Sequence, residues 1–289
     1  MKDVRMTQRI VFLLILLGAL CTFPALAGAQ SGPPQSLEGI SRFVGPQTFL
    51  VARIDVSAID LEALSSFFAR TLCVEQQLIA QQIAIVDAFK TNLEKIGGRE
   101  VYMILSTADL FENAPVLVLP IEAPMKSDAF AAVQGVLKAG FRDWECEESG
   151  EYVLCGKAPA LKRVRALDQP VRPEIGRAFR AAGKAPAQVV LIPTEDMRRV
   201  VREIMPTLPR EMGGGPGAVL SRGIMWSALG VTLPPRPAFQ FVIQSRDASA
   251  ARALHNSMDK AVRREVRGSR WFKELPRAEY LVKMLMPGV

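Results

Sequence analysis

Two carboxylates stand at matching places in the chain, each directly after a short apolar strand. Asp55 ends the segment 46–55, and Glu195 ends the segment 186–195, which has the same form. Two carboxylates that line one groove can act as acid and base in the hydrolysis of a glycan or peptide. A helical pattern follows each strand, so both residues also suit the capping of free helix amides. The pair is therefore a candidate hydrolase site, with helix capping as the alternative.

A second acidic group consists of Glu145, Glu147 and Glu148. Paired carboxylates of this kind serve glycoside hydrolysis in many enzymes. Here they fall on an expected β-hairpin, where charge along an edge strand discourages pairing with other chains. A solvated sheet edge is the simpler interpretation.

Other catalytic and metal-binding patterns are incomplete. The chain has one histidine, His255, whereas zinc sites use several His or Cys ligands at short spacing. Ser257–Lys260 reads S-x-x-K, but Ser257 falls inside an expected helix and the partner motifs Lys-Thr-Gly and Ser-Asp-Asn are missing. The run Gly213–Gly217 lacks the Lys-Ser/Thr ending of a phosphate loop. We therefore assign no catalytic residue, metal or cofactor from the sequence.

Two cysteines flank an expected hairpin. Cys146 and Cys155 enclose residues 147–154, with a turn expected near Ser149-Gly150. A two-residue turn there leaves the cysteines one step out of register, whereas a bulge or a longer loop brings them opposite. The sequence therefore leaves a disulfide between them open. Cys73, in an apolar helical pattern, is expected to be a buried free thiol.

The N-terminus has the pattern of a secretory signal peptide. Basic residues come first, followed by the unbroken apolar run Ile10–Leu20, the helix-breaking Pro24 and small residues. Both Ala25-Leu26-Ala27 and Ala27-Gly28-Ala29 fit the cleavage rule, so we expect cleavage after Ala27 or Ala29. The protein is then exported to the periplasm or beyond the cell.

Two other fates of this segment stay open. Without cleavage, the uncharged stretch 10–27 is near the lower length limit for a membrane-spanning helix and would anchor the chain. Cys21 could carry a lipid, although Leu20 stands where a lipoprotein signal prefers a small residue. No later apolar run is long enough to span a bilayer, so we expect the mature part not to do so.

The composition favours a globular protein with a basic surface. Of 289 residues, 49% are hydrophobic, and the formal net charge is +7. Removal of Lys2, Arg5, Arg9 and Asp3 with the signal takes off +2 and leaves +5. Outside the cytoplasm, an arginine-rich surface would meet anionic lipids, acidic glycans or wall polymers. Nucleic acid is not an expected partner, since the chain is exported and lacks basic residues interleaved with aromatics.

One supersecondary unit occurs twice. The first copy has a strand at 46–55, one long helix or a helix pair within 61–96, strands at 99–105 and 115–121, and a helix from Asp128. The second has a strand at 186–195, a helix with Met197, Val200, Val201, Ile204 and Met205 facing inward, strands at 222–229 and 237–243, and a helix from Asp247. Such repetition predicts an α+β fold of two divergent β-α-β-β-α repeats, forming one or more sheets covered by helices.

The expected organisation follows from these units. Residues 1–29 are the signal peptide and 30–44 a flexible lead-in. Residues 45–140 form the first repeat, 141–185 a hairpin insert with short helices, and 186–289 the second repeat with a C-terminal helix over Leu281–Met286.

Several segments resemble a group of uncharacterised exported proteins from planctomycete-type bacteria. They are the strand Phe49–Asp55 leading to Leu61, the strand pair within Val101–Ile121, Gly156 after the hairpin, and Arg172-Pro173-Glu174 before Ala178-Phe179. The likeness spans most of residues 45–260. It implies export and a repeated α+β body, and it carries no activity or site residue.

Together these features predict a non-enzymatic envelope or periplasmic protein that binds an anionic envelope component or a protein partner. The alternative is a hydrolase of a cell-envelope polymer that uses a carboxylate pair. In a third interpretation, the protein is a structural subunit that docks through Leu281–Met286.

Overall fold

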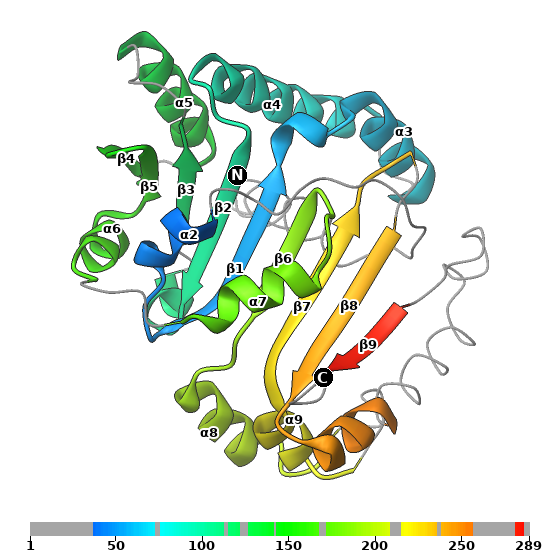
Figure 1. Cartoon of the computed structure of the whole chain (residues 1–289). Coiled ribbons are helices and arrows are strands. Elements are labelled where there is room, and N and C mark those ends of the chain that lie inside the picture. Colours follow the sequence, from blue (N-terminus) through cyan, green and yellow to red (C-terminus); the bar gives the residue numbers. More distant parts are fainter. Residues whose placement is uncertain are drawn as a thin grey trace.

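The computed structural model describes residues 37–72, 76–112, 115–121, 127–141, 143–167, 172–208, 215–235, 238–256 and 281–285. In this part of the chain, nine strands form one sheet in the order β4-β5-β3-β2-β1-β6-β7-β8-β9 (Figure 1). The strands are β1 (Thr48–Asp55), β2 (Glu100–Ser106), β3 (Val116–Pro120), β4 (Glu145–Ser149), β5 (Tyr152–Gly156), β6 (Ala187–Leu191), β7 (Ile224–Thr232), β8 (Ala238–Ser245) and β9 (Leu281–Leu285).

Helices of varied length accompany the sheet, which confirms the expected α+β class. They are α2 (Leu37–Ile40), α3 (Leu61–Leu72), α4 (Gln76–Lys95), α5 (Ser127–Gly140), α6 (Ala158–Arg165), α7 (Glu174–Ala181), α8 (Glu195–Ile204), α9 (Ala218–Gly223) and a helix over 248–256. Short 3-10 turns are η1 (Ser41–Phe43), η2 (Val56–Ala58) and η3 (Thr107–Glu112). The apolar pattern within 61–96 is thus a helix pair, which was one of the two alternatives.

The sheet has an apolar core on each face because side chains alternate along its strands. Val51, Tyr102 and Val190 belong to the cluster on the first face, with residues of α6 and α7. Ala52 and Met103 belong to the cluster on the second face, with residues of α4 and α5. In Figure 1, α2 and α7 lie in front of the strands, on the first face.

The hairpin β4–β5 turns one residue later than the sequence predicted. Ser149 pairs with Tyr152, so the two-residue loop is Gly150-Glu151. Gly150 has φ of +64°, the left-handed conformation that such loops require and that glycine adopts without strain. This register places Cys146 directly opposite Cys155, and the two form a disulfide.

The expectation of a C-terminal helix at Leu281–Met286 is wrong for residues 281–285. They form β9, which pairs with β8 in parallel, Leu281 lying opposite Gln240. A five-residue apolar run is long enough for a strand, and periodicity alone does not separate it from a short helix. The free backbone edge of β8 decides the outcome, because a strand there satisfies both partners' hydrogen bonds.

The inward face expected for 197–205 is also wrong. Helix α8 forms as expected, and the Thr194 hydroxyl accepts a hydrogen bond from the Met197 amide at 3.2 Å. However, no residue of α8 is buried, and Val200 and Ile204 are 45% and 73% exposed. The helix follows β6 at one end of the sheet and contacts α9 there, so its apolar stripe does not reach a core.

Candidate functional site

The two carboxylates of the candidate hydrolase site lie at opposite ends of the sheet. β1 and β6 are antiparallel, with Ile54 opposite Ala187 and Leu50 opposite Leu191. Asp55 therefore lies at the Ala187 end, and Glu195 lies beyond Leu191. Five residues of β6 span roughly 16 Å at about 3.3 Å per residue, so Asp55 and Glu195 do not share a groove.

Each of these carboxylates has a structural role or faces solvent. Asp55 Oδ1 accepts hydrogen bonds from the Ser57 and Ala58 amides, at 3.1 and 3.3 Å, and so caps η2. The Glu195 side chain is 78% exposed and forms a 3.4 Å ion pair with Arg202. Helix capping, the alternative for both residues, fits Asp55.

The remaining candidates of the sequence are dispersed. Glu145 and Glu148 lie on the edge strand β4, and Glu147 forms a 3.2 Å ion pair with Arg165. His255 is exposed on the helix 248–256. Ser257–Lys260 and residues 213–214 of the glycine run lie outside the described residues, and Gly217 at the end of that run directly precedes α9.

The arginines of 163–202 are largely engaged with acids of the same chain. Arg163 pairs with Asp109, and further pairs join Arg165 to Glu147, Arg172 to Glu174, Arg199 to Asp196, and Arg202 to Glu195. Burial, with repulsion from Arg246 and Arg172 outweighing attraction to Glu195, lowers the pKa of Arg198. These pairs reduce the positive charge that an acidic polymer would meet.

The residues that the structure describes also bear on metal binding and on membrane crossing. Among them, no group of three or more His, Cys, Asp or Glu side chains is arranged to hold a metal ion. In the same residues, no helix has both the length and the apolar character needed to cross a membrane.

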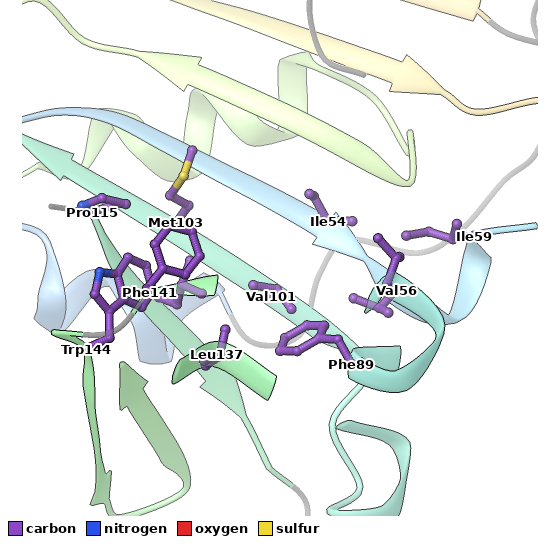
Figure 2. A pocket seen from close by; sticks show the side chains of 12 residues that line it. Ile54, Val56, Ile59, Phe89, Val101, Met103, Pro115, Leu137, Phe141 and Trp144 are labelled. Carbon is purple, nitrogen blue, oxygen red and sulfur yellow. The ribbon is translucent and has the colours of Figure 1, made fainter. Parts of the chain in front are cut away.

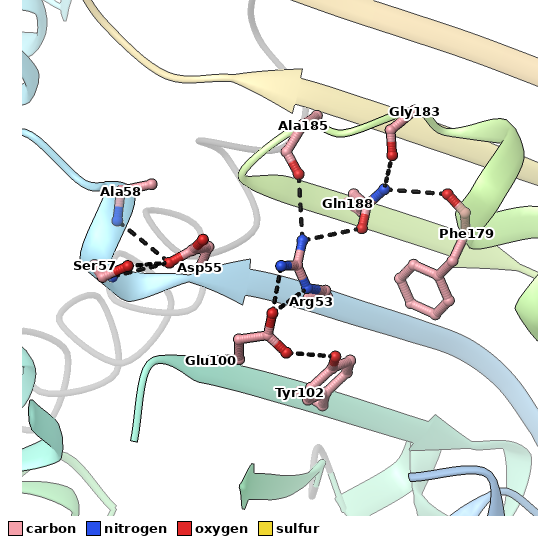
Figure 3. Close-up of polar contacts among 10 residues, drawn as sticks. All are labelled: Arg53, Asp55, Ser57, Ala58, Glu100, Tyr102, Phe179, Gly183, Ala185 and Gln188. Carbon is pink, nitrogen blue, oxygen red and sulfur yellow. Dashed lines mark hydrogen bonds and ion pairs between the residues drawn. The ribbon is translucent and has the colours of Figure 1, made fainter. Parts of the chain in front are cut away.

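A buried polar network lies on the first face, at the pairing of β2, β1 and β6 (Figure 3). Arg53 donates to the Glu100 carboxylate, with a 3.0 Å bond from Nε, and to Gln188 Oε1 at 3.2 Å. The Glu100 carboxylate also accepts from the Tyr102 hydroxyl at 2.7 Å. Burial alone would lower the pKa of Arg53, but the hydrogen bond and charge of Glu100 outweigh it and raise that pKa.

This network connects the sheet to the end of α7. The Gln188 amide group donates to the carbonyls of Phe179 and Gly183, at 3.1 and 2.7 Å, and so binds the last turn of that helix. The donors and acceptors of this network bond to other groups of the same chain, and Arg53 is only 5% exposed. The network therefore acts as a structural tie.

An apolar pocket on the second face is the strongest candidate for a binding site (Figure 2). One wall comes from the end of β1 and the turn η2, through Ile54, Val56 and Ile59. A second wall comes from α4, where Val86 and Phe89 are three residues apart and therefore share a helix face.

The floor and the far wall come from later segments. Val101 and Met103 of β2 and Leu117 of β3 form part of the sheet surface beneath the pocket, with Pro115 beside them. The far wall consists of Leu137, in the last turn of α5, and of Phe141 and Trp144, which follow the end of that helix.

The aromatic wall is fixed by the local backbone. The Phe141 amide donates to the Leu137 carbonyl at 2.7 Å, and the Trp144 amide donates to the Phe141 carbonyl at 3.1 Å. This turn stacks the two rings with centroids 4.2 Å apart and an interplanar angle of 18°. A flat aromatic surface therefore closes one side of the pocket without a flexible side chain.

The pocket offers space and apolar contact, and its lining side chains present no charged or hydrogen-bonding group to its interior. About 70 Å³ is open to the centres of water-sized molecules, several times the ~10–15 Å³ that one water needs. Water gains few hydrogen bonds there, whereas a hydrocarbon group would gain about 0.8 kcal/mol per buried methylene. The site suits binding of an apolar group.

One ammonium group lies at the margin of this pocket. Lys90, next to Phe89 on α4, donates from Nζ to the carbonyl of Ile59 at 3.1 Å. Its distance from Glu94 Oε1 is 4.0 Å, a long surface ion pair of small energy. A ligand with its chain in the pocket could place an acidic end group beside Lys90.

Sequence reasoning did not identify this pocket. Its residues come from five separate segments, and each segment reads as ordinary core in the sequence. The cluster Phe141-x-x-Trp144, just beyond a helix end, was the one local signal, because two aromatic residues in a turn are costly to leave in water. Only the packing of α4 and α5 on the sheet brings the walls together.

Comparison of the chain with protein-family models, with curated proteins and with solved structures found no match.

Proposed function

We propose that this protein is an exported, non-enzymatic envelope protein that binds an anionic amphiphile. The hydrocarbon chain of the ligand occupies the pocket beneath α4, and its acidic end lies beside Lys90. The observation that carries the proposal is the wholly apolar lining of the pocket. The acidic end group keeps the ligand within the class of anionic envelope components that the basic composition favours.

Binding of medium-chain ligands tests this proposal. We expect octanoate to displace a fluorescent apolar probe from the purified mature chain, and octanol to do so about threefold less well, since it lacks the charge that Lys90 attracts. Lys90→Gln should remove this difference between octanoate and octanol. Displacement by neither ligand would contradict the proposal.

A matched pair of variants on α4 locates the site. Val86→Trp fills the pocket and should weaken octanoate binding at least tenfold. Ile85→Trp is the control, because Ile85 directly precedes Val86 on the same helix, is 39% exposed and does not line the pocket. Equal affinities in the two variants would place the ligand elsewhere.

Export is proposed from residues 1–29, which lie outside the described part of the chain. The basic start, the apolar run and the two Ala-x-Ala sites support it. The full-length chain expressed in a Gram-negative host should be recovered from the periplasm, with a mature N-terminus at Gly28 or Gln30. Recovery from the cytoplasm with an intact Met1 would exclude export.

We also infer that the chain consists of two divergent β-α-β-β-α repeats. The strand order supports this, since β1-β2-β3 and β6-β7-β8 run outward from the central pair β1–β6 in the same sequence. Superposition of the two halves in an experimentally determined structure tests the duplication. Strands that coincide only with reversed directions would contradict it.

A further inference from the structure

The second face of the sheet carries more apolar surface than the pocket uses. We define the apolar band as six partly exposed side chains on β1, β2, β6, β7 and β8: Leu50, Leu105, Val189, Leu191, Leu229 and Phe241. Direct cross-strand pairs join them, because Leu50 lies opposite both Leu105 and Leu191, and Leu229 lies opposite both Val189 and Phe241. Residues opposite each other share one face of a sheet.

The apolar band is continuous with the pocket. Ile54 and Met103 line the pocket, and Leu50 and Leu105 lie further along the same strands on the same face. Leu50, Leu105, Val189 and Leu229 pack against the hydrophobic cluster that also contains the pocket residues. A chain bound in the pocket therefore meets the apolar band without leaving the sheet.

The described helices on this face do not account for the whole of it. α4 and α5 pack on this face through Leu93, Val133 and Leu137, and α3 packs against Phe239 of β8 through Leu64 and Phe67. The helix α7 contacts β6 and β7 from the first face. Beside these helices the six side chains of the apolar band stay partly exposed. From β2 to β8 the sheet extends over four strand spacings, or about 19 Å at about 4.8 Å per spacing. A medium-chain ligand confined to the pocket would leave the partly exposed area of the apolar band uncovered.

The chemistry of the apolar band favours a hydrocarbon chain as its occupant. The backbones of β1, β6 and β7 are paired on both sides within the sheet, so they offer no edge to an added strand. The six side chains also offer no partner to the N–H and C=O groups of an extended peptide, and burial of unpaired polar groups is costly. A hydrocarbon chain carries no such groups.

We infer that the ligand is a long-chain acyl amphiphile whose chain passes from the pocket across the apolar band. This inference rests on the proposed function, because the same ligand occupies the pocket. It assigns the ligand class: carboxylates or other anionic lipids with chains longer than the pocket alone can bury.

A chain-length series tests the inference on the mature full-length chain. Isothermal titration with octanoate, dodecanoate and hexadecanoate, below their aggregation limits, should show affinity that keeps rising, by up to about fourfold per added methylene. Leu229→Asn should weaken hexadecanoate at least tenfold and octanoate less than twofold. Ile85→Asn, on an exposed apolar residue of α4 away from the apolar band, should change neither.

A milder variant guards against misfolding of Leu229→Asn. Val189→Thr keeps the shape and the strand preference of the residue, and it should reduce the gain from octanoate to hexadecanoate while leaving octanoate binding intact. An affinity that does not rise beyond that of octanoate would overturn the inference and leave the pocket proposal standing. So would variants that weaken octanoate and hexadecanoate binding equally. Failure of the wild-type chain to bind octanoate would instead remove the proposed function itself.

Light scattering after gel filtration tests whether a second copy of the chain, and not a lipid, covers the apolar band. The wild-type chain should be a monomer whose mass is unchanged by Leu229→Asn. A dimer that this substitution dissociates would show that a second copy covers the apolar band and would also overturn the inference.

Discussion

Replacement of Arg53 by methionine is expected to lower the free energy of unfolding by about 3–5 kcal/mol, because removal of one partner leaves a buried charge uncompensated. Glu100 would lose its guanidinium partner, and Gln188 would lose the donor to its side-chain oxygen. The last turn of α7, which Gln188 binds, would loosen as well. Urea unfolding followed by tryptophan fluorescence measures the loss.

The same substitution at Arg199 is the control. The Arg199 side chain is 63% exposed and pairs with Asp196 at 3.4 Å on the surface of α8, so Arg199→Met should cost less than about 1 kcal/mol. A second test combines Arg53→Met with Glu100→Gln, which removes both charges and should recover part of the loss. Equal costs for Arg53→Met and Arg199→Met would show that the buried network contributes no more than a surface pair.

Replacement of Gly230 by alanine is expected to destabilise the fold by about 3 kcal/mol, through overpacking against backbone. A Cβ at Gly230 would lie 2.2 Å from the Ala182 carbonyl oxygen, just after α7. Since that oxygen belongs to the main chain, no side-chain rotation relieves the contact, and the end of α7 must move away from β7. Thermal unfolding followed by circular dichroism measures the effect.

Gly135→Ala is the matched control for this substitution. Gly135 lies within α5, and a Cβ there meets nothing within 4 Å. Alanine is favoured over glycine in a helix interior by about 1 kcal/mol, so this variant should be stabilised. A Gly230→Ala variant as stable as the wild-type chain would contradict the close contact between α7 and β7, and a strongly destabilised Gly135→Ala would contradict the open space beside α5.

These two positions show different limits of sequence reasoning. Arg53 sits in an apolar strand, which signals that a partner is needed, but Glu100 and Gln188 are 47 and 135 residues away. Gly230 is a single glycine inside a strand, and such a glycine often marks a place where another backbone approaches closely. The identity of the approaching residue, Ala182, depends on how α7 packs on the sheet, which the sequence does not show.

The strand and helix pattern was accessible from the sequence wherever apolar periodicity was long or was bounded by turn residues. β1, β2 and the helix pair α3–α4 formed where expected. Prediction from this pattern failed where tertiary contacts, and not local periodicity, determine the structure. Leu281–Leu285 is a strand because β8 offers a free edge, and the apolar stripe of α8 stays exposed because the helix lies at the end of the sheet.

By itself, the sequence determined the α+β class, most of the strand and helix segments apart from β9, and the expectation of export, because these depend on local composition and short-range periodicity. The candidate site depended on tertiary structure. The antiparallel pairing of β1 and β6 separates Asp55 from Glu195, and the packing of α4 and α5 assembles an apolar pocket from distant segments. Alternation buries one face of a strand but does not state what covers it, so the apolar band became visible only once the sheet order and its helices were known.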